Sequence, residues 1–503
     1  MIYSIAHNRF EHKDVNPGKL AIAGSDREIT WQEFQKEVLA FNELIKDLKV
    51  PEGHPVLIYG HKEVAFIIAI AACMMNKIPY VPIDVATPIE RVRKIAVTTQ
   101  SQVLINLSNS KPEELEIPVV IQDLTKLIQT RDPDYSKGLI LNEGDPVQYI
   151  MFTSGSTGEP KGVQITKQAI LSFSNWVNTA FDLKDDEVYM NQASFGFDVS
   201  LFELYAFLSR GSSIVLNTAD GIKSPDEFIE RIKMYNCSVW VSTPALAYMY
   251  LTDPRFNQAY LSKLNTFLFC GDVLPKRTVQ LLLERFPGSR VLNTYGPTEA
   301  TVACTLVEVT TNILEKYKEV PIGYPKNTSE LLIDNESENP EEVGALILIG
   351  DHVSIGYYNI PELNSQKFFT HNGKRAFRTG DYGYYKDGML FFSGRRDEQI
   401  KLHGYRVELG DINTQIAKHP KVKAAITIPL KSGEIVKKLI SFVQLKDHAL
   451  DKATAKADII ATIKNLLPEY MVPGDFLFVH EFPVNNSFKI DKHKLIEMYM
   501  ATA

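Results

Sequence analysis

The feature that most constrains the fold is an alternation of short β-branched runs with helical segments over roughly the first 300 residues. The runs IPYVPID, VLINL and SIVLN have the residue types of buried strands, whereas Val64–Met75 has the continuous apolar character of a buried helix. Strands that alternate with helices form βαβ units and largely parallel sheets. The sequence therefore predicts an α/β fold built on βαβ-type sheets.

The character of the chain changes twice after this region. From about 320 to 394, short strands such as GALILIG and KDGMLFFSG are separated by Gly and Asn, which predicts a β-rich subdomain. Beyond it lie two helix candidates, 409–418 and 456–467, and the strand candidates AAITIPL and LISFVQL. Because 503 residues exceed a single core, we expect a large domain over 1–396 and a small α+β domain over 397–503.

Composition and charge exclude several classes of protein. Lys and Arg total 54 against 61 Asp and Glu, a net charge of −7, so no nucleic-acid partner is expected. The first residues do not have the pattern of a secretory signal, and Val64–Met75, the longest apolar stretch, is shorter than the roughly 20 residues that span a bilayer. The four cysteines form no CxxC pair. We expect a cytoplasmic protein without membrane insertion, disulfides or a zinc site.

A Gly- and Ser-rich loop, TSGSTGEPKG (153–162), follows the apolar strand candidate Val147–Phe152. Glycines let the backbone turn its amides toward one anion, hydroxyls add donors, and a lysine adds charge, so the loop predicts a polyphosphate site. Its expected ATP-binding residues are Thr153, Ser154, Gly155, Ser156, Thr157, Gly158 and Lys161. The alternative is a flexible surface loop. A P-loop is excluded because Pro160 and Gly162 flank the lysine.

This loop resembles the signature of the adenylate-forming superfamily, which includes adenylation domains of nonribosomal peptide synthetases, acyl-CoA ligases and luciferases. Further runs resemble the superfamily's motifs in the same order along the chain: ITWQEF (29–34), YVPID (80–84), FGFDVS (195–200), NTYGPTEATV (293–302), FRTGD (377–381) and GRRDEQIKLHGYRVE (394–408). The resemblance covers essentially the whole chain, and it implies the fold expected above with a mobile small domain.

The resemblance also implies roles for residues of these motifs. An aromatic face for adenine, donors for the α-phosphate and a Mg²⁺-binding carboxylate, Glu299, would come from NTYGPTE. Asp381 would bind the ribose hydroxyls, or would otherwise be a turn aspartate, and Thr153 and Glu299 would act in catalysis together with Lys489. The remaining expected ATP-binding residues are Asn293, Thr294, Tyr295, Gly296, Pro297, Thr298, Phe392, Ser393, Gly394 and Arg395.

Two residues of the C-terminal region are assigned by the same resemblance. Asp397 matches the hinge position about which the small domain would turn. Lys489 lies in FPVNNSFKID, where Pro483, Lys489 and Asp491 match the family's pattern and Asn485, Ser487 and Phe488 depart from it. Lys489 would bridge the substrate carboxylate and the α-phosphate. A lysine in such a tail, taken alone, is usually a surface residue.

The substrate is indicated by Asp198, at the position where amino-acid-activating members place an aspartate against the substrate ammonium. The alternative is an aspartate that caps a helix starting near Ser200. Absence of a second charged group in the pocket suits a small, apolar amino acid. The other expected pocket residues are Cys270, Val302, Thr294 and Lys489, with Val199, Phe202, Leu268 and Ala303 as further lining candidates.

Within the superfamily, the runs KGVQIT, VSTPALA, FLFCGDVLP, ERFPGS and QIKLHGYRVEL are most similar to stand-alone ligases that join D-alanine to a carrier protein. In that family the residue matching Cys270 is tied to D-alanine preference, whereas an isolated cysteine of this kind is more often a small buried hydrophobe. Phe202 and Gly196 depart from the expected pattern.

The expected reaction has two halves. A small amino acid, D-alanine by resemblance, would attack Mg-ATP to give aminoacyl-AMP and pyrophosphate, and a phosphopantetheine thiol would then take the acyl group. Because few residues follow Lys489, the phosphopantetheinylated carrier is expected to be a separate protein, which implies lipoteichoic acid D-alanylation. Two alternatives stay open: an acyl-CoA ligase for another small carboxylic acid, and a catalytically silent adenylate-binding protein.

Overall fold

The structure is a computed structural model, which describes residues 9–10, 15–51, 53–108, 115–133, 139–140, 144–155, 159–335, 339–395, 399–402, 404–432, 435–447, 449–483 and 490–502. The chain forms two compact units. The first comprises Met1–Val85, Ala96–Phe152 and Gly162–Gly394, and the second comprises Ala86–Ile95, Thr153–Lys161 and Arg395–Ala503.

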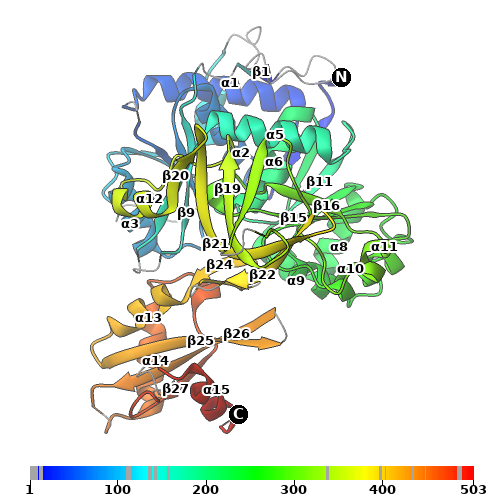
Figure 1. The fold of residues 1–503 in the computed structure, drawn as a ribbon. Coiled ribbons are helices and arrows are strands. Elements are labelled where there is room, and N and C mark those ends of the chain that lie inside the picture. Colours follow the sequence, from blue (N-terminus) through cyan, green and yellow to red (C-terminus); the bar gives the residue numbers. More distant parts are fainter. Residues whose placement is uncertain are drawn as a thin grey trace. The chain divides into compact units, whose positions relative to one another are not determined.

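A nine-stranded sheet is the larger of the two mainly parallel sheets in the first unit (Figure 1). Its strand order is β17-β16-β15-β14-β13-β11-β12-β2-β3, and every pairing from β15 to β2 is parallel. The strands are β2 (Leu20–Ala23), β3 (Glu28–Thr30), β11 (Val188–Asn191), β12 (Ser213–Leu216), β13 (Val239–Ser242), β14 (Thr266–Phe269), β15 (Arg290–Tyr295), β16 (Thr305–Glu308) and β17 (Tyr324–Pro325).

A six-stranded sheet has the order β10-β9-β5-β4-β6-β7, and its pairings from β9 to β7 are parallel. Strands β4, β5 and β6 are buried along their whole length, as expected for strands covered on both faces. The strands are β4 (Val56–Gly60), β5 (Tyr80–Asp84), β6 (Val103–Asn106), β7 (Val119–Ile121), β9 (Val147–Thr153) and β10 (Lys161–Thr166).

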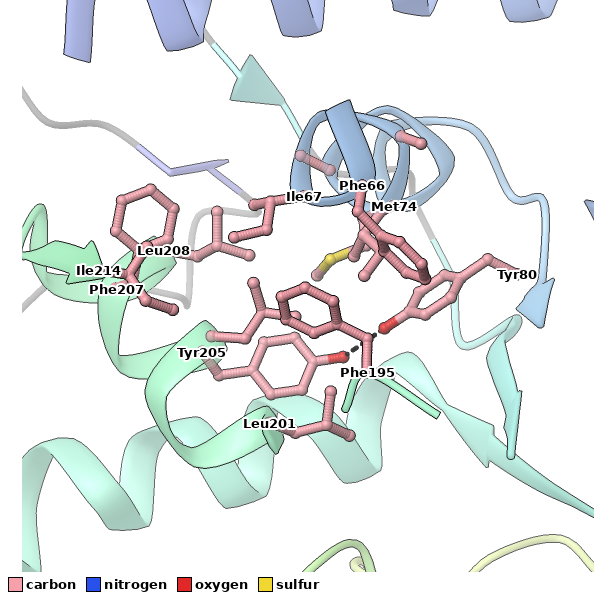
Figure 2. Close-up of a cluster of buried hydrophobic side chains, with 14 of the residues drawn as sticks. Phe66, Ile67, Met74, Tyr80, Phe195, Leu201, Tyr205, Phe207, Leu208 and Ile214 are labelled. Carbon is pink, nitrogen blue, oxygen red and sulfur yellow. Dashed lines mark hydrogen bonds between the residues drawn. The ribbon is translucent and has the colours of Figure 1, made fainter. Parts of the chain in front are cut away.

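Helix α2 (Val64–Met75) is buried at every residue from Val64 to Met74, because it packs within the main apolar core. Figure 2 shows Phe66, Ile67 and Met74 of this helix facing Tyr205 and Leu208 of α6, with Phe195 and Tyr80 between the two elements. The other helices of the first unit are α1 (Trp31–Asp47), α4 (Leu124–Gln129), α5 (Lys167–Ala180), α6 (Leu201–Arg210), α7 (Ala219–Lys223), α8 (Pro225–Met234), α9 (Pro244–Tyr250), α10 (Lys276–Arg285), α11 (Thr311–Lys316) and α12 (Pro361–Lys367). Helix α3 (Ile89–Thr99) begins in the second unit and ends in the first.

An antiparallel sheet forms the β-rich part of the first unit, with the order β18-β19-β21-β20 and β22 paired to β21. It has its own apolar core, which includes Leu346, Leu348 and Phe377. The strands are β18 (Ser329–Asp334), β19 (Gly344–Gly350), β20 (Phe368–His371), β21 (Lys374–Lys386) and β22 (Met389–Arg395); β1 (Arg9–Phe10) and β8 (Leu139–Ile140) form a separate pair.

The second unit is α+β in character and has a separate apolar core, built on residues such as Ile412, Val443 and Ile459. Its three-stranded sheet has the order β25-β26-β27, and β23 pairs with β24. The elements are β23 (Gln399–Leu402), β24 (Tyr405–Glu408), α13 (Leu409–Ala417), β25 (Val422–Ser432), β26 (Ile435–Leu445), α14 (Lys452–Lys464), β27 (Asp475–Phe478) and α15 (Lys492–Met500).

The predicted fold class is confirmed: parallel βαβ-type sheets, a β-rich part and a smaller α+β part are all present. The division of the chain into functional domains at residue 396 stays a prediction, as does the mobility of the small domain. Over the described ranges, no helix has both the length and the apolarity to cross a bilayer.

Helix α1 begins with a reciprocal capping box, which gives a first prediction. Thr30 accepts from the Glu33 amide at 3.3 Å, and the Glu33 carboxylate accepts from the Thr30 amide at 2.7 Å. Thr30→Ala should lower the free energy of unfolding by about 1 kcal/mol in urea titrations, because the Glu33 amide loses its acceptor and the Glu33 carboxylate loses the Thr30 hydroxyl as a donor. Thr179→Ala, an exposed site inside α5, is the control and should change it by less than about 0.5 kcal/mol; equal effects would contradict the capping argument.

Candidate adenylate-binding site

Three of the predicted site segments leave the same edge of the nine-stranded sheet. Parallel pairing of β11, β13, β14 and β15 brings their carboxyl ends to one edge. Asp198 lies in the segment after β11, Cys270 directly after β14, and Gly296 directly after β15. Open α/β sheets bind ligands at this edge. Asp198, Cys270 and Gly296 are far apart in the sequence, and the common direction of the parallel strands brings their segments to one edge.

The last residues of β15 are buried and are tied into the fold. Asn293 donates through Nδ2 to the Pro321 carbonyl at 2.8 Å, and Thr294 donates through Oγ1 to the Phe269 carbonyl at 2.8 Å. Both side chains therefore hold neighbouring segments against the end of β15. Their predicted roles toward ATP and substrate stay predictions.

Two residues predicted to bind different parts of a nucleoside contact each other directly. The Tyr295 hydroxyl donates to Asp381 Oδ2 at 2.6 Å, and both residues are buried. Asp381 lies on β21, and its backbone amide donates to Thr379 Oγ1 at 2.9 Å. The ring of Phe392, on β22, lies 6.4 Å from the Tyr295 ring. An aromatic face and a carboxylate are thus adjacent, as an adenosine site requires.

Glu299 is fully buried in the short helix η5 (Thr298–Ala300), whose N-cap is Pro297. Its carboxylate Oε1 accepts from the Tyr357 hydroxyl at 2.6 Å, and its carbonyl accepts from the Ser354 amide at 2.8 Å. Within the described ranges, no group of three or more His, Cys, Asp or Glu is arranged to hold a metal. A single oriented carboxylate fits Mg²⁺, which is commonly held by one or two carboxylates plus substrate phosphates.

The turn after η5 has an unusual backbone. Thr301 and Val302 have φ angles of 53° and 71°, a left-handed conformation that is a genuine outlier for a β-branched residue. Thr301 is held by its hydroxyl, which donates to the His352 carbonyl at 2.6 Å. The Val302 carbonyl in turn accepts from Cys270 Sγ at 3.8 Å. This turn therefore brings the two predicted pocket residues Cys270 and Val302 into contact.

Two glycines are required by close packing. A Cβ on Gly296 would lie 2.5 Å from the Ala303 Cα, and a Cβ on Gly155 would lie 2.2 Å from the Glu159 carbonyl oxygen. Thr153 ends β9, and its hydroxyl donates to the Lys161 carbonyl at 3.5 Å, which closes the base of the loop. In the second unit, Lys161 Nζ also lies 3.4 Å from Glu408 Oε1.

Asp198 is half-buried as the first residue of η4 (Asp198–Ser200). The N-cap of η4 is Phe197 and that of α6 is Ser200, so Asp198 is not the N-cap residue of either helix. Its role toward a substrate stays a prediction. Five predicted site residues lie outside the described residues, namely Ser156, Thr157, Gly158, Asp397 and Lys489. Ser154 follows β9, while Phe392, Ser393, Gly394 and Arg395 lie on β22.

Sequence reasoning missed residues that support this site from distant segments. Tyr357 holds Glu299 although no motif contains it. Asp84 ends the quoted run YVPID, yet its role was not assigned; its carboxylate Oδ2 lies 2.7 Å from His61 Nδ1 and accepts from Ser194 Oγ at 2.6 Å. The only available signal was an acidic residue at the carboxyl end of a buried strand.

The family described as AMP-binding enzyme matches residues 10–358. The chain therefore belongs to the AMP-binding enzyme family. The predicted superfamily and the predicted enzyme class, an AMP-forming ligase, are both confirmed, and enzymes of this class use ATP.

Relatives within the family carry a more specific name. The chain is 36% identical over 491 residues to the D-alanine–D-alanyl carrier protein ligase of Bacillus licheniformis, covering 97% of this chain and 98% of the relative. The ligase of the same name from Bacillus cereus (strain G9842) is also 36% identical, covering 95% and 96%.

Solved structures share the fold at lower identity. The Vibrio cholerae adenylation domain AlmE, in complex with glycyl-adenosine-5'-phosphate, has a TM-score of 0.83 at 22% identity and covers 100% of this chain and 98% of its own. o-Succinylbenzoate CoA synthetase (MenE) from Bacillus subtilis has a TM-score of 0.82 at 20% identity, covering 96% and 97%.

The buried bond between Tyr357 and Glu299 gives a second prediction. Tyr357→Phe should lower the free energy of unfolding by about 1–3 kcal/mol in urea titrations, because a fully buried carboxylate oxygen loses a donor. Tyr317→Phe is the matched control: its hydroxyl donates to Asp387 at 2.7 Å, but that carboxylate is exposed and water replaces the lost donor. Equal effects of the two substitutions would contradict the argument from burial.

Proposed function

We propose that the chain activates D-alanine with ATP as D-alanyl-AMP and transfers the D-alanyl group to the phosphopantetheine thiol of a separate carrier protein. The observation that carries the proposal is the half-buried carboxylate of Asp198 at the carboxyl edge of the parallel sheet. The name shared by relatives that are 36% identical over nearly the whole chain supports the same substrate.

Asp198 provides a negative charge for the ammonium group of an amino acid. A carboxylate withdrawn from water favours a cationic partner, whereas a fatty or aryl acid offers none. Cys270 and Val302 are buried and touch through a sulfur-to-carbonyl contact of 3.8 Å, and side chains of this size suit a small substrate group. This combination favours a small amino acid over a larger one.

The nucleotide is assigned to residues of the predicted ATP-binding motifs. Tyr295 offers its ring to adenine, and Asp381 accepts from the ribose hydroxyls while its position is fixed by the Tyr295 hydroxyl. The amides and hydroxyls of the 153–158 loop and the Lys161 ammonium contact the phosphates. Glu299, with phosphate oxygens, would hold Mg²⁺, which neutralises phosphate charge when bound.

In the first half-reaction, a carboxylate oxygen of D-alanine attacks the α-phosphorus of ATP, and the bond from that phosphorus to the pyrophosphate oxygen breaks. Lys489 donates to the attacking carboxylate and to the α-phosphate, where negative charge grows in the transition state. The residues that fix the two substrates supply the remaining rate enhancement by holding the reacting atoms in line. No nucleophile from the protein is required.

In the second half-reaction, the carrier's thiol attacks the acyl carbon, the thioester forms, and AMP leaves as the mixed anhydride breaks. We infer that the small domain, 397–503, turns about Asp397 so that Lys489 withdraws and the thiol enters. Small-domain movement of this kind lets one site serve two reactions in turn. The product, a D-alanyl thioester, suits lipoteichoic acid D-alanylation.

A first test of the function is substrate-dependent exchange of pyrophosphate into ATP across D-Ala, L-Ala, Gly, D-Ser, L-Ser and several fatty and aryl acids. We expect D-Ala to exceed L-Ala in kcat/KM by at least about ten-fold, equal to about 1.4 kcal/mol of transition-state discrimination. Exchange with a non-amino acid alone would favour an acyl-CoA ligase, and no exchange with any acid would favour a silent adenylate-binding protein. Either outcome would contradict the proposal.

Lys489→Ala tests whether Lys489 acts in adenylate formation but not in transfer to the thiol. Removing the ammonium should slow adenylate formation by about 100-fold or more, because the transition-state charge loses its donor. Transfer from supplied D-alanyl-AMP to the carrier thiol should change by less than about two-fold, since Lys489 has no role in that step. Lys494→Ala, an exposed lysine on α15, is the control. Loss of both half-reactions, or of neither, would contradict the role.

A further inference from the structure

The segment that carries Asp198 is held at three successive residues by side chains from other elements. The Ala193 carbonyl accepts from Lys62 Nζ at 2.5 Å, and the Ser194 hydroxyl donates to Asp84 Oδ2 at 2.6 Å. The Phe195 ring is buried and lies 4.9 Å from the Phe66 ring. Figure 2 shows this ring among Phe66, Tyr80 and Tyr205. The chain then turns directly into η4, whose first residue is Asp198.

Lys62 is the least expected of these anchors. It lies between β4 and α2, is fully buried, and donates through Nζ to Asn191 Oδ1 as well as to the Ala193 carbonyl. Its ammonium also lies 4.4 Å from the centroid of the Phe195 ring, within the range of a cation–π contact. One cation thus binds the end of β11 and two residues of the loop that follows it.

A buried cation is costly unless nearby groups compensate it. Asp84 on β5, Glu203 on α6 and Glu63 beside Lys62 are the acidic groups that act on it. Burial lowers the pKa of Lys62 to about 8, against the opposing effect of these carboxylates, so the ammonium is mostly charged at pH 7. Burial likewise raises the pKa of the fully buried Glu203 carboxyl. The buried Lys62 ammonium thus has a specific partner in the loop that leads to Asp198.

We propose that Lys62 is a positioning residue for the amino-acid substrate: its buried ammonium fixes the Ala193 carbonyl and the Phe195 ring, and thereby the place of the Asp198 carboxylate. The inference rests on the proposed function, in which Asp198 binds the substrate ammonium. Lys62 itself acts only through the loop. Its loss therefore weakens the binding of the amino acid and leaves the nucleotide residues, Tyr295 and Asp381, in place.

The test is the exchange of pyrophosphate into ATP by the full chain, with KM for D-alanine and for ATP measured separately. Lys62→Met, which keeps the length of the side chain and removes its charge and donors, should raise KM for D-alanine about ten-fold. KM for ATP should change by less than about two-fold. Lys62→Gln keeps one donor group, so its KM for D-alanine should lie between those of the wild type and Lys62→Met. If Lys62→Met does not fold, Lys62→Gln is compared with the wild type instead.

Lys326→Met is the matched control. Lys326 is likewise buried, with Nζ donating to Ser172 Oγ at 2.6 Å and lying 3.7 Å from Asp351 Oδ1, but it does not contact the loop to Asp198. It controls for the general cost of removing a buried lysine. Its KM for D-alanine should stay within about two-fold of the wild type, because KM does not depend on the fraction of enzyme that is active.

The pH dependence of KM for D-alanine distinguishes a positioning role of the Lys62 charge from a merely structural role of the side chain. Between pH 7 and 9 the wild-type Lys62 loses its proton, so its KM for D-alanine should rise more steeply than that of Lys62→Met; the substrate's own ammonium titrates equally in both. Parallel profiles, an unchanged KM for D-alanine, or an equal rise in both KM values would overturn the inference while the proposed function stands. Absence of exchange with any amino acid in the wild type would overturn both.

Discussion

Parallel pairing within the nine-stranded sheet is the constraint on which the site depends. A parallel strand fixes the direction of its neighbours, so the segments that follow β11, β14 and β15 must all begin at one edge. Hydrogen bonds along the backbone thereby place the segments that carry Asp198, Cys270 and Gly296 at this edge, whatever their side chains. The buried helix α2 and the apolar side chains in Figure 2 keep this sheet packed in a continuous core.

The side chains at that edge divide into two kinds. Some face other parts of the protein: Asn293 and Thr294 each bond a backbone carbonyl and so fix the end of β15. Others are held in place by partners but keep the chemical character that a ligand needs, as Asp381 is by Tyr295 and Glu299 is by Tyr357. Orientation of a buried carboxylate by a single phenol hydroxyl reduces the reorganisation that ligand binding would otherwise require.

Much of this arrangement could be predicted from the sequence, because motifs such as NTYGPTE and FRTGD combine residue types whose chemistry is specific. Helix α2 was predicted with the bounds that the structure shows, because twelve consecutive apolar or small residues between two predicted strands are typical of a buried helix. Contacts between distant segments could not be predicted. Tyr357 meets Glu299 only through the tertiary fold, and the left-handed backbone at Val302 has no signal in a β-branched residue, which normally avoids that conformation.

The same limit applies to Lys62. Beside Val64–Met75, a lysine in the sequence has the pattern of a polar residue at a helix start, where exposure is the ordinary outcome. Only the approach of β11 and its following loop turns it into a buried cation with two oxygen partners.

The left-handed pair Thr301–Val302 also has a consequence for the order in which the molecule assembles. Each such residue costs about 1–3 kcal/mol and keeps its conformation only while surrounding contacts impose it. The Thr301 hydroxyl depends on the His352 carbonyl, which lies in a part of the chain made later than the turn itself. During synthesis, the Thr301 hydroxyl can make this bond only after the segment around His352 has emerged and packed. A nascent chain therefore lacks this support for the turn until its β-rich part is in place.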